Sequence, residues 1–180
     1  HLELSRDIAQ KFNIDFNAPD FLKAPEPLIQ KNFARIMSLK DGTKKMSKSD
    51  PSDLSRINLT DGKDEIVNKI KKAKTDPLTL PNNDKNLSER PEVENLLGIY
   101  SNLSNQSLNN SINEFSGKNF SEFKEKLADL VVEKITPISN EINRLQKDNN
   151  FIDSVLSDGA KKASVIASKK VEEMKKIVGF

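Results

Sequence analysis

The spacing of the apolar residues changes near residue 60, and this change limits the chain to two kinds of structure. Beyond residue 60 the apolar residues recur every three or four positions, which is typical of amphipathic helices. Before it, prolines interrupt "FNAPDFLKAPEPLIQ", and only the opening "HLELSRDIAQKFN" has a helical stripe. The run "RINL" at 56–59 predicts a strand. We therefore expect α/β material over residues 1–60, an all-α bundle over 61–180, and a mostly helical chain overall.

Apolar stripes and capping residues locate the helices of the second part. Asp61, Ser107 and Asn119 are the expected caps, and the last helix is expected to turn an apolar face inward. In the first of these helices Lys69 is expected to point outward with the other lysines, opposite an apolar stripe. Pro137 should bend or divide the long fourth helix, because proline removes a backbone hydrogen bond and clashes with the preceding turn. The predicted helices cover residues 61–74, 92–103, 107–115, 119–145, 152–156 and 159–178.

The composition excludes several kinds of chemistry. The chain has no cysteine and one histidine, His1, so thiolate zinc sites, histidine metal sites and a cysteine nucleophile are excluded, and a Ser-His-Asp triad has little support. No apolar run approaches the ~20 residues of a membrane span, and no signal peptide is visible. We therefore expect a soluble, cytoplasmic protein without a membrane partner, whose chemistry relies on charge and position.

The segment "TKKMSKSDP" at residues 43–51, called here the lysine loop, lies between Gly42 and a proline that separate it from regular structure. It belongs to a basic window, residues 31–48, that begins with Lys31 and holds six basic residues against one acid, a net charge of +5. Such an excess favours a polyanion such as phosphate or RNA. The alternative is a solvated basic face without a ligand.

The side chains of the lysine loop suit the phosphates and the base of a nucleotide. In an irregular loop the ammonium groups of Lys45 and Lys48 can converge on one ligand, and they suit the charge that develops on a leaving pyrophosphate. Ser47 and Ser49 add hydroxyl donors. The flexible thioether of Met46 suits packing against adenine, although it could equally anchor the loop to the core.

The string "KMSKS" at residues 45–49 resembles the second signature of the class I aminoacyl-tRNA synthetases. Its surroundings resemble the bacterial tryptophanyl-tRNA synthetases in particular. The similar segments run through almost the whole chain in the family's order: "HLELSRDIAQKFN", "RIMSL", "KKMSKSDP", "KTDP", "VENLLGIYSNLS", "FSGKNFSEFKEKLADLVVEKITPI" and "DGAKKASVIA". The tyrosyl relatives share the fold, and a tyrosyl-type relative remains an alternative.

The resemblance implies a fold and a reaction. It implies that residues 1–60 are the C-terminal part of a Rossmann-like catalytic domain and that 61–180 are a helical domain like the family's anticodon-binding domain. Family members activate tryptophan with ATP, release pyrophosphate and transfer the aminoacyl group to tRNA, and Mg²⁺ accompanies the ATP. The matching ATP-phosphate contacts are Lys45, Ser47, Lys48 and Ser49, with the two lysines as the catalytic charges. The matching adenine contacts are Ile36 and Met46.

The resemblance also implies partners and missing parts. The family works as a homodimer that binds tRNA across both subunits. Candidate RNA contacts in the helical part are Lys134, Arg144, Lys147, Lys161 and Lys162. The family's "HIGH"-like signature and its tryptophan pocket do not occur in this sequence, so we expect an incomplete fragment. Two rival interpretations remain, an RNA-binding fragment without activation chemistry and a structural helical bundle with a fortuitous "KMSKS".

Overall fold

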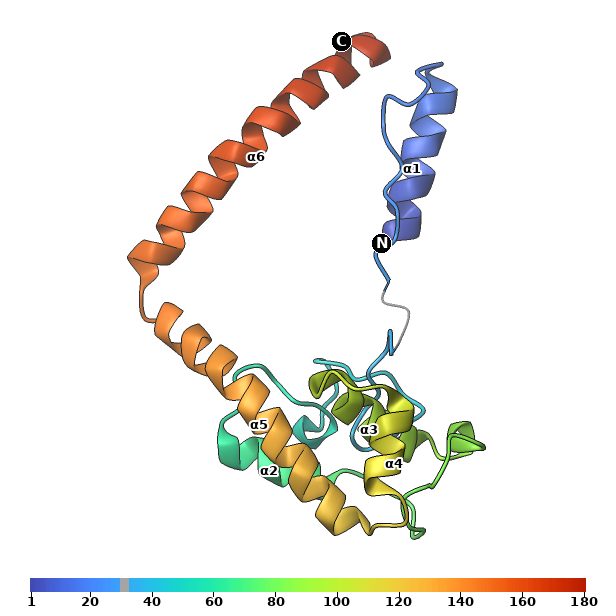
Figure 1. The fold of residues 1–180 in the computed structure, drawn as a ribbon. Helices are drawn as coiled ribbons and strands as arrows, with labels where there is room; N and C mark the ends of the chain where they lie inside the picture. The colour runs from blue at the N-terminus through green and yellow to red at the C-terminus, as the bar shows by residue number, and fades with distance from the viewer. Residues whose placement is uncertain (30–32) are drawn as a thin grey trace. The chain divides into compact units, whose positions relative to one another are not determined.

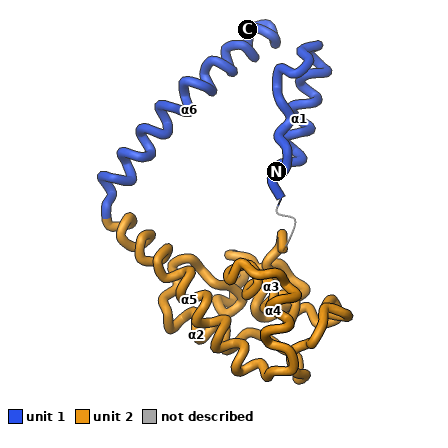
Figure 2. Tube along the Cα trace, in the orientation of Figure 1, with its two compact units in different colours: residues 1–30, 148–180 blue, residues 31–147 orange. Residues whose placement is uncertain are grey.

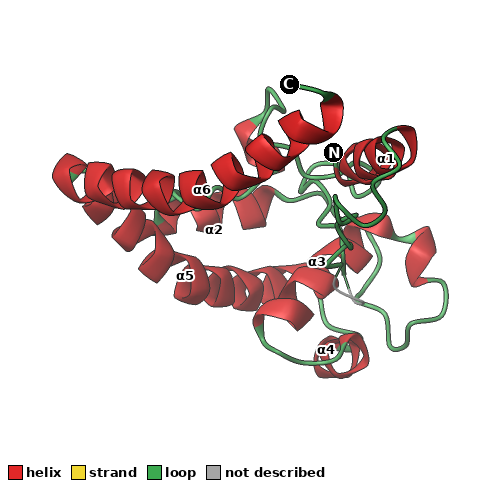
Figure 3. Cartoon of the chain, turned by 90° about the horizontal axis from the view of Figure 1, so that it is seen from above, coloured by secondary structure: helices red, strands yellow, loops and turns green. Residues whose placement is uncertain are grey.

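The computed structural model describes residues 1–29 and 33–180, and within these ranges it contains helices, turns and loops but no strand (Figures 1 and 3). The helices are α1 (Leu2–Asp15), α2 (Lys63–Lys72), α3 (Pro91–Leu103), α4 (Leu108–Phe115), α5 (Phe120–Leu145) and α6 (Asn149–Val178), with short 3₁₀ turns at Asp53–Ser55 and Leu87–Glu89. The prediction of a mostly helical chain is confirmed. No helix in the described part of the chain is long and apolar enough to cross a membrane.

The chain forms two compact units (Figure 2). The first combines His1–Gln30 with Asp148–Phe180 and holds α1 and α6; the second is Lys31–Lys147 and holds α2 to α5. In the first unit the rings of Phe12 and Phe16 lie 4.8 Å apart, and Nζ of Lys170 lies 3.6 Å from the ring centroid of Phe21. These contacts are few, and the main core belongs to the second unit.

The core of the second unit is built where α2 and α3 pack against α5. The apolar stripe predicted for α3 is buried in full, with Leu97 and Val93 completely inaccessible. Tyr100 meets the ring of Phe115 edge-on at 4.8 Å, and Phe123 of α5 lies at the same distance from Phe115. This aromatic cluster connects α3, α4 and α5, so the position of each helix depends on the other two.

The caps predicted for α4 and α5 are confirmed. The side chains of Ser107 and Asn119 accept hydrogen bonds from backbone N–H groups three residues later. Pro137 does not divide α5, which continues through it, and the proline is exposed.

The predicted break between 152–156 and 159–178 was wrong. Both segments form one helix, α6, in which an Asp158–Lys162 ion pair of 2.7 Å spans Gly159. A single glycine costs a helix only about 1 kcal/mol, which does not end it without a cap or a proline. No residue of α6 is buried, so the inward face expected for it is also absent.

The strand predicted at 56–59 was wrong as well. Arg56 is extended (φ −144°, ψ 161°), but residues 56–59 pair with no strand in the described ranges. The alternation of polar and apolar residues misled because a side chain satisfies this backbone: the N–H of Asn58 donates to Oδ2 of Asp61 at 2.9 Å. Among the described residues, the one β-bridge is antiparallel and joins Met37 and Lys45.

Lys69 was predicted to point outward, and it is buried. Its side chain is 3% exposed, and Nζ lies 2.7 Å from Oδ2 of Asp53 and 2.6 Å from Oδ2 of Asp61. Burial lowers the pKa of Lys69, but hydrogen bonds to the two carboxylates outweigh burial and leave that pKa above its ordinary value. Asp61 therefore does not cap α2 as expected; Gly62 precedes the helix, and its N–H donates to Glu65.

Lys69→Met should lower the free energy of unfolding by about 3–5 kcal/mol, because it leaves the buried Asp61 carboxylate without its ion pair. The matched control is Lys72→Met, an exposed lysine of the same helix, which should change it by less than about 0.5 kcal/mol. Urea unfolding measures both.

The hydrogen bond from Lys69 holds the pKa of Asp53 below its ordinary value. The stability that the Lys69–Asp53 ion pair contributes is therefore lost as the pH falls through that lowered pKa. The gap between wild type and Lys69→Met should narrow below about pH 4; equal effects of both variants at pH 7 would contradict the assignment.

Candidate functional site

The lysine loop begins beside the segment that precedes it. The N–H of Ser38 donates to the carbonyl oxygen of Lys44 at 2.8 Å, and the N–H of Met46 donates to that of Ile36 at 3.0 Å. These two bonds lie on either side of the Met37–Lys45 bridge and make a short antiparallel pairing. The backbone of the two residues matched to the adenine contacts, Ile36 and Met46, is therefore joined directly.

Asn95 of α3 holds this pairing against the helical core. Its Oδ1 accepts from the N–H of Met37 and its Nδ2 donates to the carbonyl of Met37, both at 2.8 Å. The Asn95 side chain is almost fully buried, so these bonds satisfy its polar groups where water has little access. Sequence reasoning missed this residue, although a polar side chain within the buried stripe of α3 was a usable signal.

Gly42 starts the loop where two segments approach closely. A Cβ at this position would lie 2.5 Å from the backbone N of Glu92 and from the backbone C of Pro91. Only glycine fits such an approach to the first turn of α3. The turn around Gly42 is closed by Asp41, whose Oδ1 accepts from the N–H and the hydroxyl of Thr43. The start of the loop is thus fixed on both sides.

The tip of the loop is held by its own side chains. The hydroxyls of Ser47 and Ser49 lie 2.9 Å apart, and the N–H of Asp50 donates to the carbonyl of Ser47 at 3.3 Å. Lys45 and Lys48 are both exposed, and within the described ranges neither ammonium group has an ion pair or hydrogen bond. The tip therefore combines two hydroxyls with two available cations.

The neighbouring basic residues are arranged differently. Nζ of Lys44 lies 3.3 Å from Oδ2 of Asp41, and Nζ of Lys40 contacts the hydroxyl of Ser52 at 3.4 Å. Lys31 of the basic window lies outside the described residues. The structure thus distinguishes Lys45 and Lys48 from the lysines beside them.

Ile36 and Met46 differ in environment. Ile36 is 46% exposed, whereas Met46 is partly buried and packs against the core. The contact of Met46 with the core agrees with the alternative in which it anchors the loop. The exposed apolar side chain of Ile36 leaves a surface that a flat ring could cover.

The five candidate RNA contacts are divided between the two units. Three of them lie in surface ion pairs with acids of their own helix: Lys134 with Glu133, Arg144 with Glu141, and Lys162 with Asp158. The remaining two, Lys147 and Lys161, are exposed. The first three in sequence belong to the second unit and the last two to the first unit.

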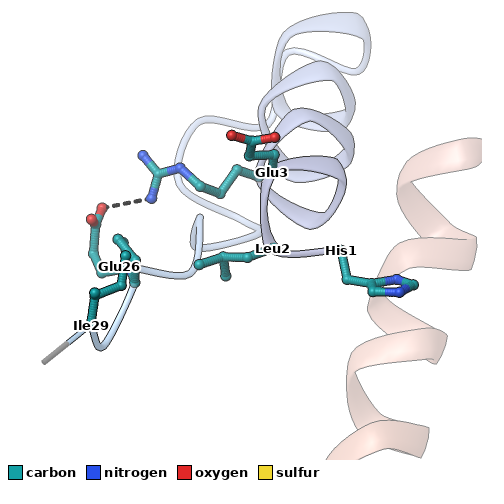
Figure 4. Close-up of a pocket in the computed structure, with 7 residues that line it drawn as sticks. His1, Leu2, Glu3, Glu26 and Ile29 are labelled. Carbon is teal, nitrogen blue, oxygen red and sulfur yellow. Dashed lines mark hydrogen bonds and ion pairs between the residues drawn. The ribbon is translucent and has the colours of Figure 1, made fainter. Parts of the chain in front are cut away.

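A cavity of about 590 Å³ lies at the start of α1, away from the lysine loop in sequence (Figure 4). Its wall contains Arg6, which donates to Glu26 at 2.9 Å and to the carbonyl of Pro25 at 2.6 Å. This cation is thus already paired. Among the residues that the structure describes, no group of three or more His, Cys, Asp or Glu side chains is placed to hold a metal ion.

Residues 1–137 match the family model described as tRNA synthetases class I (W and Y). The chain belongs to this family. Over its whole length it is 51% identical to the tryptophan–tRNA ligase of Caulobacter vibrioides, of which it covers 52%. It is 49% identical to that of Rickettsia felis and covers 54% of it. The chain spans about half the length of the curated relatives that it matches.

The fold agrees with the family assignment. The solved tryptophanyl-tRNA synthetase from Mycoplasma pneumoniae matches the whole chain with a TM-score of 0.82 and 29% sequence identity, and the match covers 53% of that structure. The resemblance read from "KMSKS" and its surroundings to the bacterial tryptophanyl-tRNA synthetases is thereby confirmed. The lysine loop, residues 43–51, lies within the part of the chain that matches the family model.

Proposed function

We propose that this chain is the C-terminal part of a tryptophan–tRNA ligase, which forms tryptophanyl-adenylate from tryptophan and ATP and then charges tRNA. The observation that carries the proposal is the 51% identity to a tryptophan–tRNA ligase along the whole chain, which itself contains "KMSKS". Residues 1–60 are proposed as the end of the Rossmann-like catalytic domain and 61–180 as the anticodon-binding-like helical domain. The tyrosyl-type alternative is less well supported, because the relatives at about 50% identity are tryptophan–tRNA ligases.

In the proposed reaction the tryptophan carboxylate attacks the α-phosphorus of ATP. A carboxylate O–P bond forms, the bond from the α-phosphorus to the bridging oxygen breaks, and pyrophosphate leaves with the electron pair. Lys45 and Lys48 offset the charge that develops on the pyrophosphate, and the hydroxyls of Ser47 and Ser49 donate to its oxygens. Two unit charges 4 Å apart gain roughly 4 kcal/mol at an effective dielectric of about 20, so either lysine is enough to affect the rate.

The remaining parts of the proposal concern partners. Ile36 would contact adenine with Met46 beside it, and Mg²⁺ would enter with the ATP phosphates. A hydroxyl of the terminal ribose of tRNA would then attack the activated carbonyl and release AMP. Lys134, Arg144, Lys147, Lys161 and Lys162 are proposed as RNA contacts, and the protein as a cytoplasmic homodimer. Ion pairs such as Arg144–Glu141 are exposed and cost little to break, so they do not prevent such contacts.

Tryptophan-dependent exchange of pyrophosphate into ATP tests the proposal against the RNA-binding alternative. The protein at its full natural length should catalyse this exchange, and tyrosine should not replace tryptophan. The 180-residue chain alone should not, because positioning of both substrates requires a complete site. Exchange that requires tyrosine would overturn the tryptophan assignment, and no exchange at full length would favour a binding module.

Lys48→Ala, in the protein at its full natural length, should lower kcat for pyrophosphate exchange by about 10²–10³-fold. The KM for tryptophan should change little, because the lysine acts on the leaving group. Lys44→Ala is the matched control: it removes a lysine of the same loop that is paired with Asp41, and it should keep kcat within a few-fold. If tryptophan binding and rate weaken together in Lys48→Ala, the assigned role is wrong.

A further inference from the structure

The end of the lysine loop is held by one arginine that the sequence motifs do not mark. Nη1 of Arg56 donates to the carbonyl of Asp50 at 2.9 Å and to that of Ser52 at 3.4 Å. The side chain is 18% exposed, so these bonds are shielded from water on most sides. The carbonyl of Asp50 directly follows the Ser47–Ser49 turn, and Arg56 therefore fixes the residue at which the tip ends.

Arg56 is itself oriented by Asp53, which also pairs with Lys69 of α2. Its Nη2 lies 2.9 Å from Oδ1 of Asp53, and its Nε donates to Oδ1 of Asn58 at 3.0 Å. The other oxygen of Asp53, Oδ2, lies 2.7 Å from Nζ of the buried Lys69. A continuous series of charged contacts thus runs from helix α2 through Asp53 and Arg56 to the loop backbone.

The two ends of the loop are held by different side chains. The first end is held by the pairing of Met46 with Ile36 and by Asn95, and the second by Arg56. Between them, Lys48 lies at a turn whose hydrogen bonds, within the described ranges, join its neighbours Ser47, Ser49 and Asp50 to one another. The position of Lys48 relative to the core is consequently set by how firmly the second end is held.

We propose that Arg56, supported by Asp53 and Lys69, is a positioning residue that places Lys48 for the phosphate chemistry. It contacts no phosphate itself and acts by holding the Asp50 and Ser52 carbonyls. This inference rests on the proposed function for its catalytic consequence. The guanidinium fork is what the role requires, because it bonds two carbonyls, a carboxylate and an amide at once, and an ammonium group cannot reproduce that planar geometry.

The test is Arg56→Lys in the protein at its full natural length, which keeps the charge and removes the fork. Arg90→Lys is the matched control. Arg90 is also 18% exposed and also bonds a carboxylate, Asp76, and a carbonyl, that of Thr79, outside the loop. Both variants are measured by amide hydrogen exchange without ligand, by thermal unfolding, and by the kcat and KM of pyrophosphate exchange.

In Arg56→Lys we expect the amides of Ser49, Asp50 and Ser52 to exchange at least about 5-fold faster, while those of α3 and α5 keep their wild-type rates. The kcat should fall about 10-fold, with the KM for tryptophan unchanged, since small displacements of a catalytic group are costly. Arg90→Lys should leave both the loop amides and kcat at wild-type values. The inference would be overturned if the loop amides of Arg56→Lys exchanged at wild-type rates. It would also be overturned if both variants changed the loop's amide exchange and kcat equally.

The pyrophosphate-exchange activity of the wild-type protein separates this inference from the proposed function. If wild-type protein lacks tryptophan-dependent pyrophosphate exchange, the proposed function fails and the catalytic part of the inference fails with it. If wild-type protein is active and Arg56→Lys loosens residues 48–52 without lowering kcat, the positioning role alone is wrong. Faster loop exchange together with the kcat loss in Arg56→Lys, and neither in Arg90→Lys, supports it.

Discussion

The rest of the second unit depends on the ion pairs that the buried ammonium group of Lys69 makes with Asp53 and Asp61. Removing this charge from water is costly, and the two carboxylates of Asp53 and Asp61 offset that cost. The segment between the loop and α2 must therefore fold back onto the helix. Leu39 then lies between the two, with its N–H donating to Ser55 and its carbonyl accepting from Lys74. The lysine loop is closed by this arrangement at its base.

A loop with a fixed base and an available tip is suited to polyanion chemistry. The anchors, Asn95 and Arg56, bond backbone groups and leave the loop's own side chains available. The ammonium groups of Lys45 and Lys48 have no partner among the described residues, whereas Lys44 already faces Asp41. Ordering a phosphate ligand between them would therefore not first require breaking an ion pair. This division between anchored backbone and free cations underlies the proposed ligase function.

Local signals in the sequence predicted what depends on neighbouring residues. The stripe of α3 and the caps Ser107 and Asn119 were predictable, because helical periodicity and capping act over three or four positions. Burial of Lys69 was not, since it depends on acids 8 and 16 positions earlier in the chain. The role of Asn95 depends on a segment 58 positions away. Within the site, "KMSKS" marks the residues proposed to contact phosphate, while Arg56 and Gly42, which bond or approach the loop backbone, carry no motif.

Protection of the lysine loop by nucleotide tests the central claim most directly. Limited proteolysis with trypsin of the protein at its full natural length, with and without a non-hydrolysable ATP analogue and tryptophan, would follow cleavage after Lys44, Lys45 and Lys48. The account predicts that the analogue slows cleavage at Lys45 and Lys48 by about 10-fold or more, because their side chains engage phosphates. Cleavage after Lys147, far from the loop in sequence, should not change. Equal cleavage of the loop with and without the analogue would contradict the assignment of this loop as a nucleotide site.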